Sequence, residues 1–204
     1  MTRSNSRKKH ADRVFISARR IKNRVKHLAG RVSKDYSGKE LLIVAVLKGS
    51  VVFFSDLIRQ LDINCGVDFI SVSSYKGTRS TGEIRFLADL RESPKGRNIL
   101  LVEDIVDSGY TLNYLKKNLL ARKAATVRTC VLLDKKDARK APVKVDYAGF
   151  VIPDEFVVGY GLDYNEQYRG LPYIGILGKG IKSTALDCAG KNGPKVKNKG
   201  KSRL

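Results

Sequence analysis

Several residue types are scarce or absent in this chain of 204 residues. It has no tryptophan, a single methionine and only three cysteines, Cys65, Cys130 and Cys188. Their odd number and unrelated spacings fit neither a disulfide framework nor a zinc site, so we expect free thiols in a reducing compartment. No stretch approaches the roughly 20 apolar residues of a membrane span, and the basic N-terminus lacks the apolar segment of a signal peptide. We therefore expect a cytoplasmic protein with no membrane partner.

Acidic residues are also scarce relative to basic ones. The chain has 40 Lys and Arg against 20 Asp and Glu, which gives a net charge of +20. Residues 1–39 hold 13 basic and 2 acidic residues, residues 178–204 hold 8 and 1, and the part between them holds 19 and 17. An excess at the two ends favours solvated cationic arms over a nucleic-acid groove built into the fold.

Composition also predicts the domain organisation. Residues 1–12 and 179–204 have few apolar residues to bury, so we predict a disordered basic arm and a disordered basic tail there. Residues 13–178 are enough for one domain with a core of its own. The two arms would attract polyanions, RNA included, through a salt-sensitive field that is indifferent to sequence.

Apolar periodicity gives an alternation of strands and helices between the two arms. It predicts helices over residues 14–36, 51–61 and 112–122, and strands over residues 41–47, 67–73, 84–90, 99–102, 126–133, 145–152 and 156–159. Such an alternation favours an α/β fold with a mostly parallel sheet covered by helices on both faces.

The most informative stretch is residues 98–111, with the sequence NILLVEDIVDSGYT. A short apolar strand is followed by three acids, Glu103, Asp104 and Asp107, then by a small polar loop and the predicted helix. Ligands bind at the carboxyl ends of parallel strands, where the free amides of a helix N-terminus attract phosphate. The acids could accept hydrogen bonds from sugar hydroxyls or lie near Mg²⁺. Acids that only cap the helix are the alternative for any one of them, and the Walker phosphate-binding pattern is absent.

Residues 102–111, VEDIVDSGYT, closely resemble the phosphoribosyl-pyrophosphate (PRPP) signature of type I phosphoribosyltransferases. From Val14 to Leu177 the chain resembles the hypoxanthine(-guanine) branch of that family. The resemblance implies a phosphoribosyltransferase fold, in which a twisted sheet is flanked by helices and a small hood is formed by N- and C-terminal segments. It implies that Asp107 lies near purine N7 and accepts a proton, and that Glu103 and Asp104 serve ribose and metal. The loop expected to hold the 5′-phosphate consists of Ser108, Gly109, Tyr110 and Thr111.

Three further segments match family motifs for the leaving group. Lys48 and Gly49 resemble a pyrophosphate-binding turn, in which the Leu47–Lys48 peptide bond is typically cis. Asp163 matches a carboxylate associated with the second Mg²⁺, and Arg169 an arginine that faces pyrophosphate. Without the central motif, the first would be an ordinary turn, and Asp163 and Arg169 a surface ion pair.

The resemblance also assigns the purine site and a lid. Lys144 matches the lysine that donates to a purine 6-oxo group, because an ammonium donates hydrogen bonds and accepts none. Phe156 matches an aromatic that stacks on the purine, and Val157 a residue whose backbone meets the base edge. Ser74 and Tyr75 open a polar loop similar to the family's lid, which would exclude water. Taken alone, these residues would belong to a solvent face, to the core and to a surface loop.

These resemblances predict an enzyme of purine salvage. It would transfer phosphoribose from PRPP to N9 of hypoxanthine, and also of guanine, giving IMP or GMP and pyrophosphate. The preference among hypoxanthine, guanine and xanthine is left open. The enzyme would require Mg²⁺ and form a homodimer or homotetramer. A nucleic-acid-binding regulator on the same fold is the rival hypothesis, based on the basic termini. The last three residues, Ser202-Arg203-Leu204, are similar to a peroxisomal address, which would matter only in a eukaryote.

Overall fold

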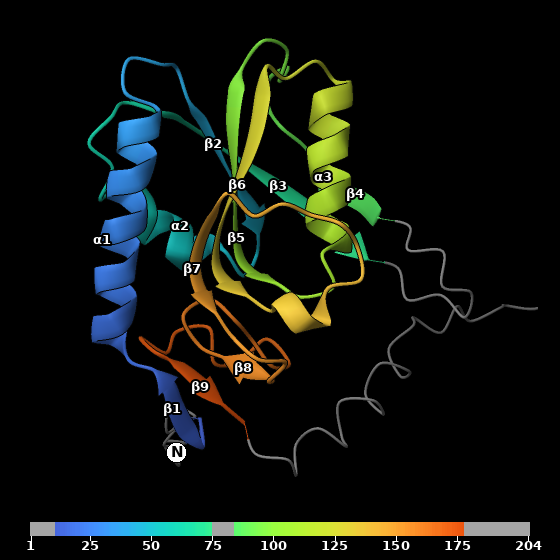
Figure 1. The fold of residues 1–204 in the computed structure, drawn as a ribbon. Coiled ribbons are helices and arrows are strands. Elements are labelled where there is room, and N and C mark those ends of the chain that lie inside the picture. Colours follow the sequence, from blue (N-terminus) through green and yellow to red (C-terminus); the bar gives the residue numbers. More distant parts are fainter. Residues whose placement is uncertain (1–10, 75–83, 178–204) are drawn as a thin grey trace, which may run out of the picture.

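The structure is a computed structural model of the whole chain, and it describes residues 11–74 and 84–177 (Figure 1). The predicted basic tail, nearly all of the predicted N-terminal arm, the lid residue Tyr75, Cys188 and the C-terminal tripeptide lie outside the described residues. The predicted domain bounds therefore stay a prediction.

Strands and helices alternate along the described chain, as expected. The strands are β1 (Arg13–Ile16), β2 (Leu42–Leu47), β3 (Gly66–Ser74), β4 (Ile84–Ala88), β5 (Asn98–Val106), β6 (Thr126–Asp134), β7 (Tyr147–Val151), β8 (Val157–Val158) and β9 (Ile174–Ile176). The helices are α1 (Ala18–Asp35), α2 (Val51–Ile58), α3 (Tyr110–Ala121) and the short 3₁₀ helix η1 (Lys136–Ala138).

The strands form two sheets. The larger one has the order β4-β3-β2-β5-β6-β7, and every pairing in it is parallel except that of β4 with β3. Helices α1 and α2 cover one face and α3 covers the other (Figure 1). The smaller sheet has the order β1-β9-β8 and is antiparallel. It joins the two ends of the described chain, so the expected α/β fold with a small hood is confirmed.

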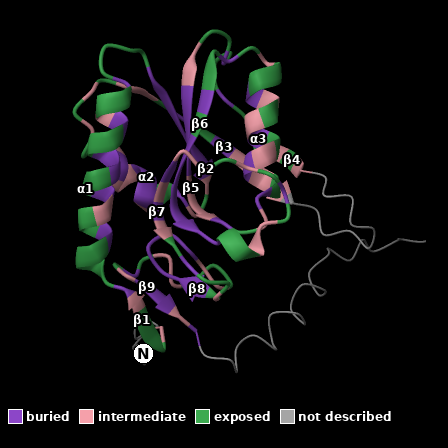
Figure 2. Cartoon of the chain, viewed as in Figure 1, coloured by how far each residue is buried: buried purple, intermediate pink, exposed green. Residues whose placement is uncertain are grey.

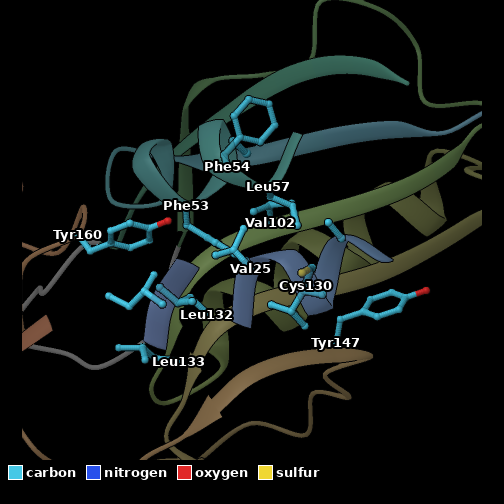
Figure 3. Packing of buried hydrophobic residues seen from close by; sticks show 14 of the residues in the cluster. Val25, Phe53, Phe54, Leu57, Val102, Cys130, Leu132, Leu133, Tyr147 and Tyr160 are labelled. Carbon is cyan, nitrogen blue, oxygen red and sulfur yellow. The ribbon is translucent and has the colours of Figure 1, made fainter. Parts of the chain in front are cut away.

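The core lies on both faces of the parallel sheet, as the strand sequences require. Along β2, Ile43 and Ala45 pack toward α1 and α2, whereas Val44 and Val46 pack toward α3. Figure 2 shows this strand buried along its length. Figure 3 shows side chains of α1 and α2, Val25 and Phe53 among them, meeting those of the sheet. Cys65 and Cys130 are both free, as predicted, and no described helix is long and apolar enough to cross a membrane.

The N-terminal helix begins later than its apolar spacing suggested. Residues 14–16 belong to β1, which pairs with β9, and the hydroxyl of Ser17 caps α1 by accepting from the backbone N–H of Arg20 at 3.4 Å. Val-Phe-Ile suits a strand as well as a helix, and the partner strand decides between them. The predicted helix over 14–36 is wrong in its first turn. Strand β9 has no counterpart among the predicted elements.

Leu115 and Leu120 provide a matched test of this packing, because both lie in α3. Leu115 is fully buried and Leu120 is 46% exposed. We expect Leu115→Ala to lower the free energy of unfolding by about 2–5 kcal/mol, from lost burial and the cavity left behind. Leu120→Ala should cost much less in the same urea titration. Equal losses would mean that α3 does not pack on the sheet through this face.

Candidate active site

Predicted site residues gather where β2 and β5 end, beside the N-terminus of α3. The sequence placed Glu103 and Asp104 just after the central strand, and this is wrong, since β5 continues to Val106. Both acids therefore lie inside a central strand, and only Asp107 follows its end. Their side chains are partly buried, whereas that of Asp107 is 61% exposed.

The loop from Asp107 to Gly109 joins β5 to α3 in a conformation that depends on glycine. Gly109 has φ of +81° at the N-cap of α3, and a Cβ there would lie 2.9 Å from the side chain of Val143. A cavity of about 100 Å³ is lined by residues of this segment, including Glu103, Asp107, Ser108 and Thr111. Backbone amides at a helix N-terminus favour an anion.

The connection between β6 and β7 supports this loop, which motif reading did not anticipate. The backbone N–H groups of Lys140 and Ala141 both donate to the carbonyl of Ser108 at 2.9 Å. Arg139 donates to the Val143 carbonyl at 2.7 Å and to the buried Asp134 carboxylate at 2.5 Å. The contacts to Ser108 join segments far apart in sequence, so no local pattern in the sequence pointed to them.

The turn after β2 makes close contacts through its backbone. The Leu47–Lys48 peptide bond is cis, as the resemblance implied. A Cβ added at Gly49 would overlap the carboxylate of Asp104, and one added at Gly161 would overlap the backbone oxygen of Gly49. Gly161 also has φ of +101°, which favours glycine. Three segments far apart in sequence therefore meet at this point.

The segment after β8 brings two predicted residues together and adds a third. Asp163 and Arg169 form an ion pair at 2.8 Å, and Arg169 also donates to the Gly161 carbonyl at 2.8 Å. The carboxylate of Glu166 lies 3.3 Å from the Lys48 ammonium and 3.3 Å from the Arg169 guanidinium. Glu166 has φ of +57°, and its N–H donates to Asp163 at 2.9 Å. No motif singled out Glu166, because it meets Lys48 across 118 positions.

A buried lysine links Asp107 to the hood. The ammonium of Lys135 lies 3.8 Å from a carboxylate oxygen of Asp107 and 3.1 Å from one of Asp154. Only 8% of the Lys135 side chain is exposed. A buried ammonium needs such anionic partners. Lys135 therefore holds the carboxylates of Asp107 and Asp154 near its ammonium group. Its position directly after a buried strand was the available signal in the sequence.

The predicted purine residues lie on different elements. Lys144 precedes β7, has an 81% exposed side chain and lies 3.8 Å from Asp146. Phe156 precedes β8, is 37% exposed and meets Tyr164 edge to face at a centroid distance of 5.7 Å. Val157 is buried in β8, and Ser74 ends β3. A larger cavity, of about 640 Å³, lies between α1, α2 and residues 169–172, and Arg169 is the predicted site residue that lines it.

Desolvation dominates the electrostatics of the two strand acids. Burial, with the nearby charge of Asp104, raises the pKa of Glu103 to about 8. Burial raises the pKa of Asp104 to about 6, although backbone N–H groups and Arg169 oppose the rise. Cations near these carboxylates would favour their ionised forms.

The donor set fits a metal held partly by substrate. Within residues 11–74 and 84–177, no group of three or more His, Cys, Asp or Glu side chains is placed to hold a metal by itself. Mg²⁺ commonly takes one or two carboxylates together with phosphate oxygens and water. Asp104 and Asp163, which interact electrostatically, supply such a partial set of oxygens.

The site lies inside the region matched by a known family. The family model for the phosphoribosyl transferase domain matches residues 16–165, about three quarters of the chain. The chain belongs to the phosphoribosyltransferase family. The sequence-based assignment to that family, and to its enzymes, is confirmed.

Relatives of this phosphoribosyltransferase agree on the branch. The chain is 47% identical over 170 residues to the hypoxanthine-guanine phosphoribosyltransferase of Lactococcus lactis, covering 83% of this chain and 92% of that protein. A hypoxanthine phosphoribosyltransferase structure from Staphylococcus aureus aligns with a TM-score of 0.81 at 45% identity, over 84% of this chain and 94% of that one. One from Trypanosoma cruzi, a ternary complex with substrates, gives 0.80 at 40% identity, over 84% and 98%.

The raised pKa values predict how stability depends on pH. Glu103 and Asp104 keep protons in the folded protein up to about pH 8 and about pH 6, whereas the unfolded chain loses them near pH 4. The native state therefore binds more protons in this window, and linkage makes stability fall as pH rises through it. In excess chelator, Glu103→Gln should lose less unfolding free energy than wild type between about pH 5 and about pH 8. If the unfolding free energies of the two proteins changed in parallel with pH, the Glu103 carboxylate would be exposed to water.

Proposed function

We propose that this phosphoribosyltransferase transfers the 5-phosphoribosyl group of PRPP to N9 of hypoxanthine, and also of guanine, releasing pyrophosphate. The observation that carries the proposal is the position of Asp107. It follows the central strand, opens the loop at the N-terminus of α3 and remains exposed beside a buried lysine. The names of the relatives support the same substrates.

The phosphoribose end would bind along the loop after β5. The N–H groups of the loop, with the hydroxyls of Ser108 and Thr111, suit the 5′-phosphate. Tyr110 is 52% exposed, and we assign only its backbone to this site. Glu103 and Asp104 would serve the ribose hydroxyls and the metal.

The pyrophosphate end would bind between the turn after β2 and the segment after β8. Lys48 and Arg169 bring two cations to one point through their shared partner Glu166. Gly49 allows the backbone to approach closely. Asp104 and Asp163, with Glu103, would hold Mg²⁺, which neutralises the departing pyrophosphate.

The purine end would use Asp107, Lys144 and the hood. Asp107 would accept the N7 proton as N9 attacks ribose C1′, and the Lys135 ammonium lies 3.8 Å from its carboxylate. Lys144 would donate to the 6-oxo group, which disfavours adenine. Phe156 would stack on the base and Val157 would meet its edge. Ser74 and Tyr75 would belong to a lid, and we propose a cytoplasmic homodimer or homotetramer.

A comparison of four bases tests the proposed substrates. Purified enzyme receives PRPP, Mg²⁺ and one of four bases, hypoxanthine, guanine, xanthine or adenine, and the nucleotide products are separated. We expect inosine monophosphate to form fastest, guanosine monophosphate next and adenosine monophosphate least. Turnover with adenine at the rate of hypoxanthine, or full activity in excess chelator, would overturn the proposal.

Replacing Asp107 tests the proton transfer. Asp107→Asn keeps the size of the side chain but removes its basicity, so turnover should fall by about 10²-fold or more, with PRPP affinity little changed. Asp62→Asn, an exposed aspartate in the loop after α2, is the control and should leave turnover unchanged. Wild-type turnover in Asp107→Asn would remove this residue from the mechanism.

Replacing Glu166 should strengthen the binding of the leaving group, pyrophosphate. Its carboxylate is within 3.3 Å of both cations assigned to pyrophosphate, so an entering anion must displace it. Glu166→Gln should tighten pyrophosphate binding by roughly two- to fivefold in calorimetry, the size expected of exposed ion pairs. Glu92→Gln is the matched control, because Glu92 pairs with Arg97 at the same distance of 3.3 Å. Weaker binding by Glu166→Gln would instead mean that Glu166 positions the cations.

A further inference from the structure

Much of the N-terminal positive charge lies on the fold, in helix α1. Its sequence ARRIKNRVKHLAGRVSKD contains seven Lys and Arg residues and a single acid, Asp35. The sequence-based interpretation gave this charge to solvated arms, and for α1 that interpretation is wrong. The helix buries one apolar face against the sheet, so its cations are held on the opposite and lateral faces.

Three arginines of α1 line up along the edge strand β7. The guanidinium groups of Arg20 and Arg24 lie over the ring of Phe150, with centroid distances of 5.8 and 5.2 Å. That of Arg31 lies over Tyr147 at 5.3 Å. Positions 20, 24 and 31 recur at four and seven residues, so they share one side of the helix. We call Arg20, Arg24 and Arg31 the arginine stripe.

No arginine of the stripe forms an ion pair with a described carboxylate, although Arg31 is near enough to Asp35 to interact with it electrostatically. Six other arginines of the fold each pair with a carboxylate, namely Arg59, Arg97, Arg122, Arg128, Arg139 and Arg169. The ion pairs found among the described residues do not include the stripe. Asp35, the acid of α1, accepts from the Tyr147 hydroxyl at 2.7 Å and from Arg128 at 3.1 Å. The aromatic rings hold the guanidinium groups in place and carry no charge that would neutralise them.

A cavity lies beside Arg20 and Arg24 of the stripe. A hollow of about 380 Å³ is lined by Arg20, Asn23, Arg24, His27 and Phe150, all from α1 and β7. It lies on the α1 side of the sheet, whereas the proposed active site is formed at the strand ends and by the N-terminus of α3. The two sites are therefore separate on this chain.

We propose that the arginine stripe binds the backbone of a single-stranded nucleic acid. From Arg20 to Arg31 the helix rises about 16 Å, a length suited to a few nucleotides, and single-strand sites span roughly 4–16 nucleotides. Guanidinium groups bind phosphate through paired hydrogen bonds and stack on bases. Fixed positions reduce the entropy lost when the strand binds. This function is independent of the transferase reaction.

Charge-matched variants of the full chain test the stripe. A fluorescent 12-nucleotide oligouridine is titrated at several salt concentrations into wild type, Arg20→Gln/Arg24→Gln/Arg31→Gln and Lys95→Gln/Lys117→Gln/Lys123→Gln. The control removes the same charge from exposed lysines outside α1. We expect the stripe variant to bind at least tenfold more weakly and the control less than threefold. The slope of log K against log salt should fall by about 2 in the stripe variant.

A lysine variant, a competition experiment and sedimentation distinguish nucleic-acid binding from other uses of the stripe. Replacing the three stripe arginines with lysine keeps their charge, so most of the salt dependence should remain while the affinity for the oligonucleotide falls. This variant tests the proposal even if the glutamine variant folds poorly. Equal weakening in stripe and control variants would overturn the proposal in favour of a diffuse field. Competition by polyglutamate as strong as by RNA would assign the stripe to an acidic protein segment, and a changed sedimentation coefficient in the stripe variant would assign it to a subunit contact. Either result would overturn the proposal.

Discussion

The site depends on close contacts at two glycines, where a larger residue would not fit. The turn after β2 presses Gly49 against the carboxylate of Asp104, and the segment after β8 presses Gly161 against the carbonyl of Gly49. The three segments come from the second strand, the central strand and the hood. These contacts tie the hood to the carboxyl ends of the parallel strands, and they place Lys48 and Arg169 around one point. A methyl group at either glycine would have to displace backbone or the carboxylate of Asp104.

Charges around this point balance one another in the described structure. Two partly buried acids with raised pKa values lie in β5, and the positive charge of Arg169 acts on one of them, Asp104. Glu166 bridges the cations of Lys48 and Arg169, and Lys135 does the same for Asp107 and Asp154 on the purine side. Lys48, Asp107, Asp163 and Arg169 thus each lie beside a group of opposite charge. A highly charged substrate with its metal would exchange these partners rather than meet isolated charges.

The sequence predicted those helices and strands whose own residues show a clear apolar period. The apolar runs of β2 and β5, the leucines of α3 and the buried positions of α1 were all visible in the sequence, because their periods follow from which faces are buried. The residues of β1 have a pattern equally compatible with a helix, and β9 has only three residues. Both form because they pair with each other.

The same division applies to the site. Asp107 and the loop to Thr111 stand in one continuous motif, and the resemblance found them. Glu166 and Lys135 act through partners distant in sequence, so no local pattern could assign them. The charge count treated residues 1–39 as one block and missed that α1 fixes seven of its cations on the folded surface.

Pyrophosphate binding by a Gly161→Ala variant tests the glycine contacts most directly. Gly170→Ala is the matched control, because a Cβ at Gly170 meets nothing within 4 Å. Both variants are first confirmed as folded by urea titration, and the dissociation constant of pyrophosphate with Mg²⁺ is then measured by calorimetry. We predict at least a tenfold loss of affinity for Gly161→Ala and less than a twofold change for Gly170→Ala. Wild-type affinity in a folded Gly161→Ala variant would contradict this prediction.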